Sequence, residues 1–202
     1  MKYNIFWDED LYVSVMETYK DVVDLETGFL LSQNGITSNG INGKYEHIPS
    51  RHIEKYLRIL YNSNKDASFL DIGSGLGNVL HLAKLIGFND VSGIECNTTL
   101  KKYNEGLNII WGDIFDNSEL LKGKKLIYLF RPYVKDEDMD KLLSFIYEHS
   151  DEDVIIFYNY PHISCDNINE KCCGFYYYTH IYGCYGIFYK KKNLIKLLNP
   201  EI

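Results

Sequence analysis

The sequence predicts an α/β fold, in which strands and helices alternate along the chain. Three observations point to it. From residue 49 onward, short apolar runs of strand length alternate with longer segments whose apolar residues recur at helical spacing. The stretch "FLDIGSGLGN" at 69–78 combines a buried-strand pattern with three closely spaced glycines. The last third holds two aromatic runs with no helical segment between them. Such alternation favours parallel strands joined by right-handed crossovers.

The composition limits the classes of function. The 202 residues are 46% hydrophobic and 24% charged, which is typical of a single domain that folds alone. A net charge of −7 disfavours nucleic acid, and the basic run 190–192 reads as a solvated strand end. No window has the apolar length of a signal peptide or a membrane span, so we expect a cytoplasmic protein without membrane contact. Five cysteines without C-x-x-C spacing predict reduced thiols, with no zinc site or disulfide framework.

The N-terminal part is predicted to be a helix followed by a loop. Apolar residues at helical spacing across 9–28 predict the helix, and three glycines between 35 and 43 mark the loop. We interpret residues 1–48 as a helix and lid loop that belong to the same unit as the main domain, 49–202.

The main domain begins at Pro49, with Ser50 as a candidate N-cap. Polar residues around Leu120 and Leu121 interrupt the alternation once. The predicted helices are 50–63, 78–88, 98–105 and 136–149, and the predicted strands are 67–72, 90–95, 107–113, 125–130 and 153–160. The tail, 174–181 and 183–191, predicts a hairpin around Tyr182-Gly183, which would add at least one antiparallel strand to the sheet.

The glycine-rich stretch predicts a ligand site. Open α/β sheets bind ligands at the carboxyl ends of their strands, and Gly73, Gly75 and Gly77 allow a tight turn close to a ligand. By itself G-x-G-x-G serves nicotinamide cofactors, flavins and S-adenosylmethionine alike. A carboxylate beside the helix N-terminus would repel a pyrophosphate. Asp71 stands two residues before the first glycine, so it favours a ligand with a cationic ammonium or sulfonium group.

Two further acids follow predicted strands. Glu95 lies 24 residues after Asp71, where a carboxylate can accept both hydroxyls of a ribose. Asp113 can accept a hydrogen bond from an exocyclic amine, with Ile114 packing on the adenine ring. Each acid alone is also a common residue at a turn, a strand end or a helix start, and that alternative remains open.

Residues 67–130 resemble the Rossmann-like (class I) S-adenosylmethionine-dependent methyltransferases. The segments that carry the resemblance are "DIGSGLG", "GIECN" and "GDIF", in the order and spacing of that family. The resemblance implies a three-layer sandwich around a seven-stranded, mostly parallel sheet with an antiparallel strand in its C-terminal hairpin. It also implies S-adenosylmethionine as the cofactor, with the glycine loop at its methionine end, Glu95 at the ribose and Asp113 at the adenine.

The region before the domain is similar to a leader of small bacterial methyltransferases, which implies that Tyr45 closes over the cofactor. The cofactor-binding residues implied by the resemblance are Tyr45, Asp71, Gly73, Ser74, Gly75, Gly77, Glu95, Cys96, Asp113, Ile114 and Phe130.

Substrate-side residues are expected after the fourth strand, where the chain reads Arg131-Pro132-Tyr133. Methyltransferases that act on amines of nucleobases or protein side chains often carry Asn or Asp, two prolines and an aromatic residue there, and the missing amide or acid disfavours methylation of a nucleobase amine. Arg131 could clamp a carboxylate or phosphate, or form a structural ion pair. The catalytic candidates are Arg131, Tyr133, Asn159 and His162. His162 and His180 suit a general base, although both could be ordinary strand-end histidines.

The sequence therefore predicts an S-adenosylmethionine-dependent methyltransferase acting on a nitrogen or oxygen of a small molecule or protein side chain. Two alternatives stay open: a non-catalytic S-adenosylmethionine-binding regulatory or partner protein, and an NAD-dependent oxidoreductase. The sequence does not specify an oligomeric state.

Overall fold

The computed structural model describes residues 51–104, 106–130, 132–159, 171–180 and 185–191. The predicted N-terminal helix, the lid loop and the candidate N-cap Ser50 lie outside these residues. The domain division at residue 48 therefore stays a prediction.

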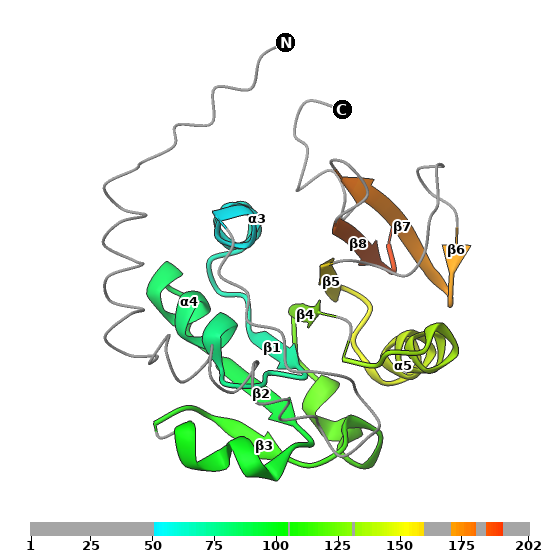
Figure 1. Cartoon of the computed structure of the whole chain (residues 1–202). Helices are drawn as coiled ribbons and strands as arrows, with labels where there is room; N and C mark the ends of the chain where they lie inside the picture. Colours follow the sequence, from blue (N-terminus) through cyan, green and yellow to red (C-terminus); the bar gives the residue numbers. More distant parts are fainter. Residues whose placement is uncertain (1–50, 105, 131, 160–170, 181–184, 192–202) are drawn as a thin grey trace.

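The described strands form one sheet in the order β3-β2-β1-β4-β5-β8-β7-β6 (Figure 1). Strands β1 to β5 are parallel, and β8 lies antiparallel between β5 and β7. The strand order reverses between β1 and β4, which is where doubly wound sheets bind ligands. The strands are β1 Phe69–Ile72, β2 Val91–Glu95, β3 Ile109–Trp111, β4 Leu126–Phe130, β5 Ile155–Asn159, β6 Lys171–Cys172, β7 Phe175–His180 and β8 Tyr185–Tyr189.

All seven predicted strands are present, and the antiparallel C-terminal hairpin is confirmed as β7 and β8. The two-residue strand β6 adds one more at the edge, beside β7. Two residues are too few to give an alternating pattern, so the sequence did not predict it. The described fold is the mostly parallel, mixed α/β sheet that the family resemblance implies.

Helices cover both faces of this sheet. Figure 1 shows α3 (Arg51–Ser63) and α4 (Asn78–Ile86) on one side and α5 (Asp136–His149) on the other. The segment predicted as a helix at 98–105 is instead the 3-10 helix η1, Thr98–Tyr103. Its capping residues take part in the candidate site and are described there. Two shorter 3-10 helices, η2 (Ile114–Asp116) and η3 (Ser118–Leu121), follow β3.

Among the described residues, the core consists of one large apolar cluster on each face of the sheet and a small third cluster of Leu76 and Leu100, against which Trp111 packs. Along β4, Leu126 and Tyr128 belong to the cluster beneath α3 and α4, whereas Ile127 and Leu129 belong to the cluster beneath α5. This division follows from the two-residue period of a strand, and it explains why the parallel strands read as continuous apolar runs.

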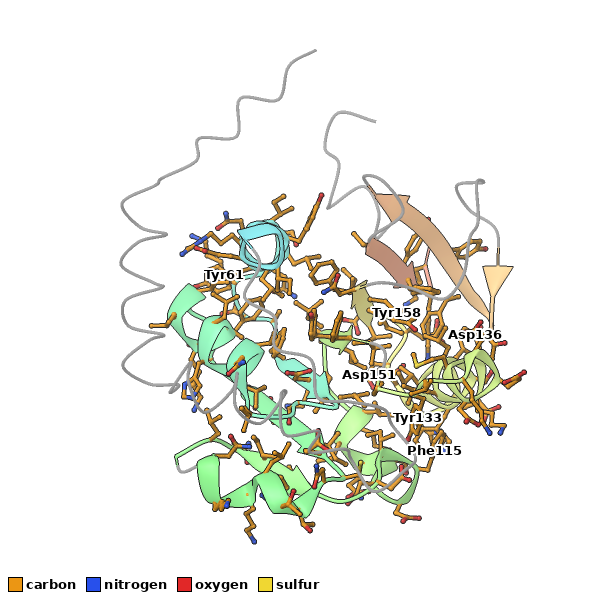
Figure 2. All side chains as sticks on the ribbon, in the orientation of Figure 1. Tyr61, Phe115, Tyr133, Asp136, Asp151 and Tyr158 are labelled. Carbon is orange, nitrogen blue, oxygen red and sulfur yellow. The ribbon has the colours of Figure 1, made fainter. Side chains whose placement is uncertain are left out.

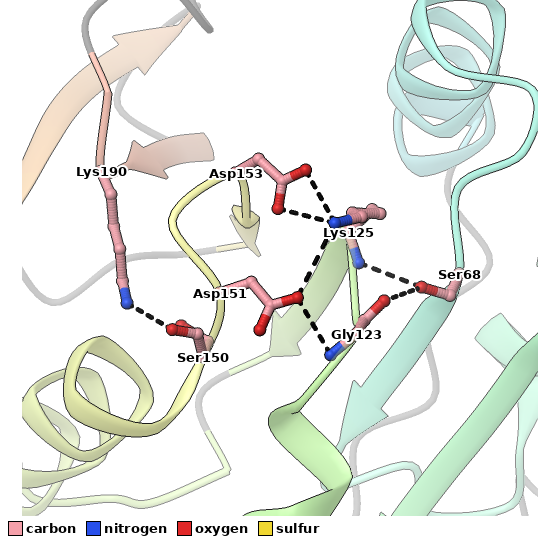
Figure 3. Close-up of polar contacts among 7 residues, drawn as sticks. All are labelled: Ser68, Gly123, Lys125, Ser150, Asp151, Asp153 and Lys190. Carbon is pink, nitrogen blue, oxygen red and sulfur yellow. Dashed lines mark hydrogen bonds and ion pairs between the residues drawn. The ribbon is translucent and has the colours of Figure 1, made fainter.

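A polar network joins the amino-terminal ends of three neighbouring strands (Figure 3). The Lys125 ammonium lies 2.7 Å from the carboxylate of Asp153 and 3.7 Å from that of Asp151. The Lys125 amide donates to Oγ of Ser68, which itself donates to the carbonyl of Gly123. Half-exposed ion pairs of this kind contribute at most about 1 kcal/mol each. The network therefore connects β1, β4 and β5 at their amino-terminal ends. The predicted site lies at the opposite, carboxyl-terminal ends of the strands.

Candidate functional site

The glycine-rich loop connects β1 to α4 through three residues with positive φ. Gly73, Gly75 and Gly77 have φ values of +80°, +53° and +76°. At Gly73 a side chain is excluded twice, because an added Cβ would also lie 2.9 Å from Cβ of Pro132. Gly77 is the left-handed N-cap of α4. The loop therefore depends on bare backbone, as the sequence predicted, and Pro132 forms one wall of it.

Four backbone N–H groups of this loop donate hydrogen bonds to other groups of the protein. The N–H groups of Gly73 and Ser74 donate to the carbonyl of Ile94 at 2.9 and 3.1 Å. The Gly75 N–H donates to Oε2 of Glu95 at 2.9 Å, and that of Gly77 to the carbonyl of Ser74 at 2.7 Å. A phosphate-binding loop would direct such N–H groups at its ligand. These four amides are not arranged as a cradle for an anion.

Two buried carboxylates lie beside the loop, on the neighbouring strands β1 and β2. Asp71, next to the last residue of β1, is 3% exposed, and Glu95 ends β2 with 7% of its surface exposed. Burial, and then the negative charge of Glu95, raise the pKa of Asp71 well above its ordinary value. Ionised Asp71 is therefore costly in the free protein, and a bound cation would compensate it.

Glu95 is held by hydrogen bonds on both of its oxygens. Oε1 accepts the N–H of Asn97 at 2.7 Å, while Oε2 accepts the N–H of Gly75. The half-buried thiol of Cys96 also lies 3.6 Å from Oε1. A carboxylate oxygen has more than one acceptor direction, so each can still accept a hydroxyl from a ligand. The carboxylate of Glu95 is thus held in one orientation by backbone N–H groups on both of its oxygens.

Asn104 completes this arrangement, and the sequence did not predict it. Its Nδ2 donates to the carbonyl of Gly75 at 2.8 Å, and the side chain is buried. Within the described residues its Oδ1 has no hydrogen-bond partner. In the sequence, Asn97 and Asn104 stand on either side of a short helical segment. This pattern predicts that they cap the helix, but it does not predict a contact of Asn104 with a distant loop.

Ser74 lies under the loop against β2. An added Cβ on Gly93 would come 2.8 Å from its hydroxyl, so Gly93 leaves the space that Ser74 occupies. Oγ of Ser74 is buried and has no partner within the described part of the chain. A buried, unpartnered oxygen at this position can accept or donate a hydrogen bond to a ligand.

Asp113 and Tyr133 meet at the end of β3. Oδ1 of Asp113 accepts the Phe115 N–H at 3.1 Å and the hydroxyl of Tyr133 at 3.2 Å. Figure 2 shows the Tyr133 and Phe115 side chains next to each other, with ring centroids 5.9 Å apart. Burial, followed by the charge of Asp113, raises the pKa of Tyr133. Tyr133 therefore stays protonated and donates its hydrogen bond to Asp113.

Two more of the predicted cofactor-binding residues, Ile114 and Phe130, lie at the carboxyl ends of the strands. Ile114 is buried directly after Asp113, at the start of η2. Phe130 is partly buried at the carboxyl end of β4, in register with Asn159 of β5. The structure thus places most of the predicted cofactor residues along the ends of β1 to β4.

Asn159 occupies the next strand end and is 1% exposed. Its Nδ2 donates to the hydroxyl of Tyr128 at 3.3 Å, and its Oδ1 has no partner among the described residues. Tyr128 is in turn the register partner of Asp71. Side chains along a strand alternate between the two faces of the sheet, and those of Asp71, Tyr128 and Asn159 lie on the face covered by α3. Together they form a polar row across β1, β4 and β5.

Several predicted residues lie outside the described part of the chain: Tyr45, Arg131 and His162. The backbone of His180 ends β7 opposite Tyr185, the residue that pairs with Asn159. Within the described ranges, no group of three or more His, Cys, Asp or Glu side chains is arranged to hold a metal. Those ranges also contain no helix with the length and apolar content to cross a membrane.

No protein-family model and no curated protein sequence matches the chain. Solved structures do. They include the plantazolicin methyltransferase BpumL in complex with a pentazolic desmethylPZN analog and SAH, at 23% identity over 53% of this chain and 44% of that one, with a TM-score of 0.45. A SAM-dependent methyltransferase from Archaeoglobus fulgidus matches at 26% identity over 55% and 52%, with a TM-score of 0.44.

An O-methyltransferase from Bacillus cereus in complex with SAH matches at 15% identity over 78% of this chain and 68% of that one, with a TM-score of 0.47. The chain spans about half the length of the first two structures. With TM-scores below 0.5, these likenesses do not by themselves assign a reaction to this chain.

Proposed function

We propose that the protein is an S-adenosylmethionine-dependent methyltransferase acting on a nitrogen or oxygen of a small molecule or protein side chain. One observation carries this proposal: two buried carboxylates, Asp71 and Glu95, stand beside a glycine loop in which four N–H groups already donate hydrogen bonds within the protein. A site of this kind favours a cationic nucleoside ligand over one that presents phosphates.

The residues fit S-adenosylmethionine in a consistent order along the sheet. Asp71, beside the loop, would lie at the cationic methionine end. Glu95 would accept the ribose hydroxyls, and Asp113 would accept the adenine amine with its Oδ2, because Oδ1 already holds two hydrogen bonds. Ile114 supplies an apolar surface next to Asp113.

When bound, S-adenosylmethionine supplies an activated methyl group on a positively charged sulfur. The chain's own task is then to hold donor and acceptor in line and to exclude water, and neither requires a strong base. Asn159 supports an acceptor site next to the methionine end, because its unpartnered Oδ1 lies two strands from Asp71 on the same face. A side-chain amide there can orient an acceptor that carries a hydrogen-bond donor.

Calorimetry with S-adenosylhomocysteine and NADH tests the cofactor assignment. We expect binding of S-adenosylhomocysteine, no binding of NADH, and loss of binding in Asp71→Ala. Binding of NADH alone would favour the oxidoreductase alternative. Wild-type affinity in Asp71→Ala would refute the site.

A second assay separates catalysis from binding alone. The protein is incubated with radiolabelled S-adenosylmethionine and fractionated cell extract, and label is sought in small molecules, protein and RNA. We expect label in a small molecule or in protein. Tight cofactor binding with no labelled product would favour the non-catalytic alternative, and labelled RNA would overturn the proposed substrate class.

A further inference from the structure

The 3-10 helix η1 is anchored at both ends to the candidate cofactor site. At its start, the N–H of Asn97 donates to Oε1 of Glu95 at 2.7 Å. At its end, Nδ2 of Asn104 donates to the carbonyl of Gly75 at 2.8 Å. The N–H of Gly75 donates to Oε2 of Glu95 at 2.9 Å, which closes a ring of three contacts.

We propose that Asn104 is a positioning residue that sets the preference of this site for a ligand with both ribose hydroxyls. It acts through Gly75, which in turn orients the carboxylate of Glu95. The proposal rests on the proposed function, and it adds a determinant of ligand selectivity that lies outside the glycine loop and the strand-end acids.

Gly75 needs such an external restraint. Its φ of +53° is open to glycine, but glycine also populates most other backbone conformations at little cost. The sequence therefore permits this conformation without selecting it. Glu95 fixes the N–H side of Gly75 and Asn104 fixes its carbonyl side, so together they restrain both of its backbone angles.

The orientation of Glu95 depends on the same ring. A glutamate side chain loses rotamer entropy when a ligand fixes it, and this cost is smaller if the side chain is already held. With both oxygens held, its carboxylate plane is set before a ligand arrives. If Gly75 moved away, Oε1 would keep its hydrogen bond to Asn97, but the carboxylate could rotate and carry Oε2 out of position. A diol needs both oxygens in place, whereas a single hydroxyl needs only one.

Asn104 also allows positioning to be separated from stability. Its Oδ1 is buried without a partner among the described residues, which is itself unfavourable. Leucine has a similar shape and would remove this oxygen together with the bond to Gly75. Aspartate keeps the shape and, when ionised, cannot donate at all. A purely structural role would therefore change the melting temperature of these variants without changing which ligand they prefer.

The experiment compares three ligands by calorimetry: S-adenosylhomocysteine and its 2′-deoxy and 3′-deoxy analogues. The wild type is expected to bind each deoxy analogue about tenfold or more weakly, since a lost hydroxyl leaves part of Glu95 unpaired. In Asn104→Leu and Asn104→Asp, we expect the ratio of the affinity for S-adenosylhomocysteine to that for a deoxy analogue to fall to about twofold. A decrease of this size corresponds to the contribution of about one hydrogen bond. Asn89→Asp, at an exposed position before β2, is the matched control and should keep the wild-type ratio.

Each outcome decides the proposal. An unchanged ratio in a folded Asn104 variant overturns it, and so does an equal loss of affinity for all three ligands. If one variant fails to fold, as judged by circular dichroism, the other decides; loss of folding in both assigns Asn104 a purely structural role. If the wild type binds no S-adenosylhomocysteine, the proposed function itself fails. Binding with an unchanged ratio refutes only the role of Asn104.

Discussion

Pro132 packs directly over Gly73, so the segment after β4 forms a wall of the loop after β1. An added Cβ on Gly73 would lie 2.9 Å from Cβ of Pro132, in a backbone conformation with φ +80°. Real side chains do not approach this closely, and a proline ring cannot rotate away. The contact joins the candidate donor-binding loop to the segment expected to face the acceptor.

Gly73→Ala is expected to combine two costs. A left-handed conformation costs an L-residue about 1–2 kcal/mol, and the clash with Pro132 adds about 1–3 kcal/mol. Gly106→Ala is a matched control, because Gly106 has φ +81° and nothing within 4 Å of an added Cβ. Urea denaturation should show a clearly larger loss for Gly73→Ala, and only this variant should weaken S-adenosylhomocysteine binding. Equal losses in both variants would show that Pro132 yields.

Asp71→Asn is expected to stabilise the ligand-free protein at neutral pH. Because the folded-state pKa of Asp71 is raised, the folded protein binds a proton more tightly than the unfolded chain. Its stability therefore falls as pH rises from the ordinary aspartate range through the raised pKa, by about 1.4 kcal/mol for each pKa unit. The variant lacks this loss. Denaturation curves from pH 4 to pH 8 should converge at the acidic end and separate at neutral pH, and a less stable variant at pH 8 would contradict the assignment.

Ligand affinity should show the complementary pH dependence. The ammonium group of S-adenosylhomocysteine favours ionised Asp71, so its binding should weaken as pH falls through the raised pKa of Asp71. In Asp71→Asn the affinity should be lower and should vary less with pH. Calorimetry from pH 5 to pH 8 measures both curves. Parallel curves for the two proteins would mean that another group titrates.

Tyr133→Phe tests the interpretation of Tyr133 as a donor to Asp113. Loss of its hydrogen bond should weaken S-adenosylhomocysteine binding by about two- to tenfold, because Asp113 is then oriented by one contact fewer. The pH profile of binding between pH 6 and pH 10 should not change, since the raised pKa keeps the phenol protonated. Tyr61→Phe, in α3, serves as the control. A basic limb of the binding profile that vanishes only in Tyr133→Phe would mean that Tyr133 titrates in this pH range, which would contradict its interpretation as a permanent donor.

Lys125→Met should affect stability alone. It removes the two ion pairs to Asp151 and Asp153 near the amino-terminal ends of β4 and β5, which predicts a loss of stability of at most about 2 kcal/mol. Affinity for S-adenosylhomocysteine should equal that of the wild type. A weakened affinity would mean that the two edges of the sheet are coupled.

The strands and the strand-end acids could be predicted from the sequence for a local reason. Strands buried on both faces are continuous apolar runs, so an acid such as Asp71 or Glu95 within or just after one stands out. The segment at 98–105 was harder. Its residues favour a helix, but Asn97 and Asn104 cap a single short 3-10 stretch that is bonded to Glu95 and Gly75.

The contacts of Asn104 and Pro132 could not be predicted, because both depend on tertiary structure. Asn104 reaches Gly75 across 29 positions of sequence, and Pro132 reaches Gly73 from a different strand end. The same applies to Tyr133, whose partner Asp113 is 20 positions away and determines that the phenol donates. Residue type and spacing indicated a role for Tyr133, whereas its protonation depends on burial that only the fold creates.

The antiparallel placement of β8 has a consequence for how the molecule can diversify. The first residue of β8 pairs with Asn159, the last residue of β5, and also with the last residue of β7. The chain therefore leaves β5, leaves β7 and enters β8 at the same ends of the strands as the glycine loop. Among the described residues, the hydrogen bonds of that loop go to β2, to Asn104 at the end of η1 and to the loop itself, and Pro132 after β4 packs over Gly73. Under the proposed function, exchanging residues 160–170 or 181–184 between relatives should therefore change which molecule is modified without removing a described hydrogen bond of the donor-binding loop.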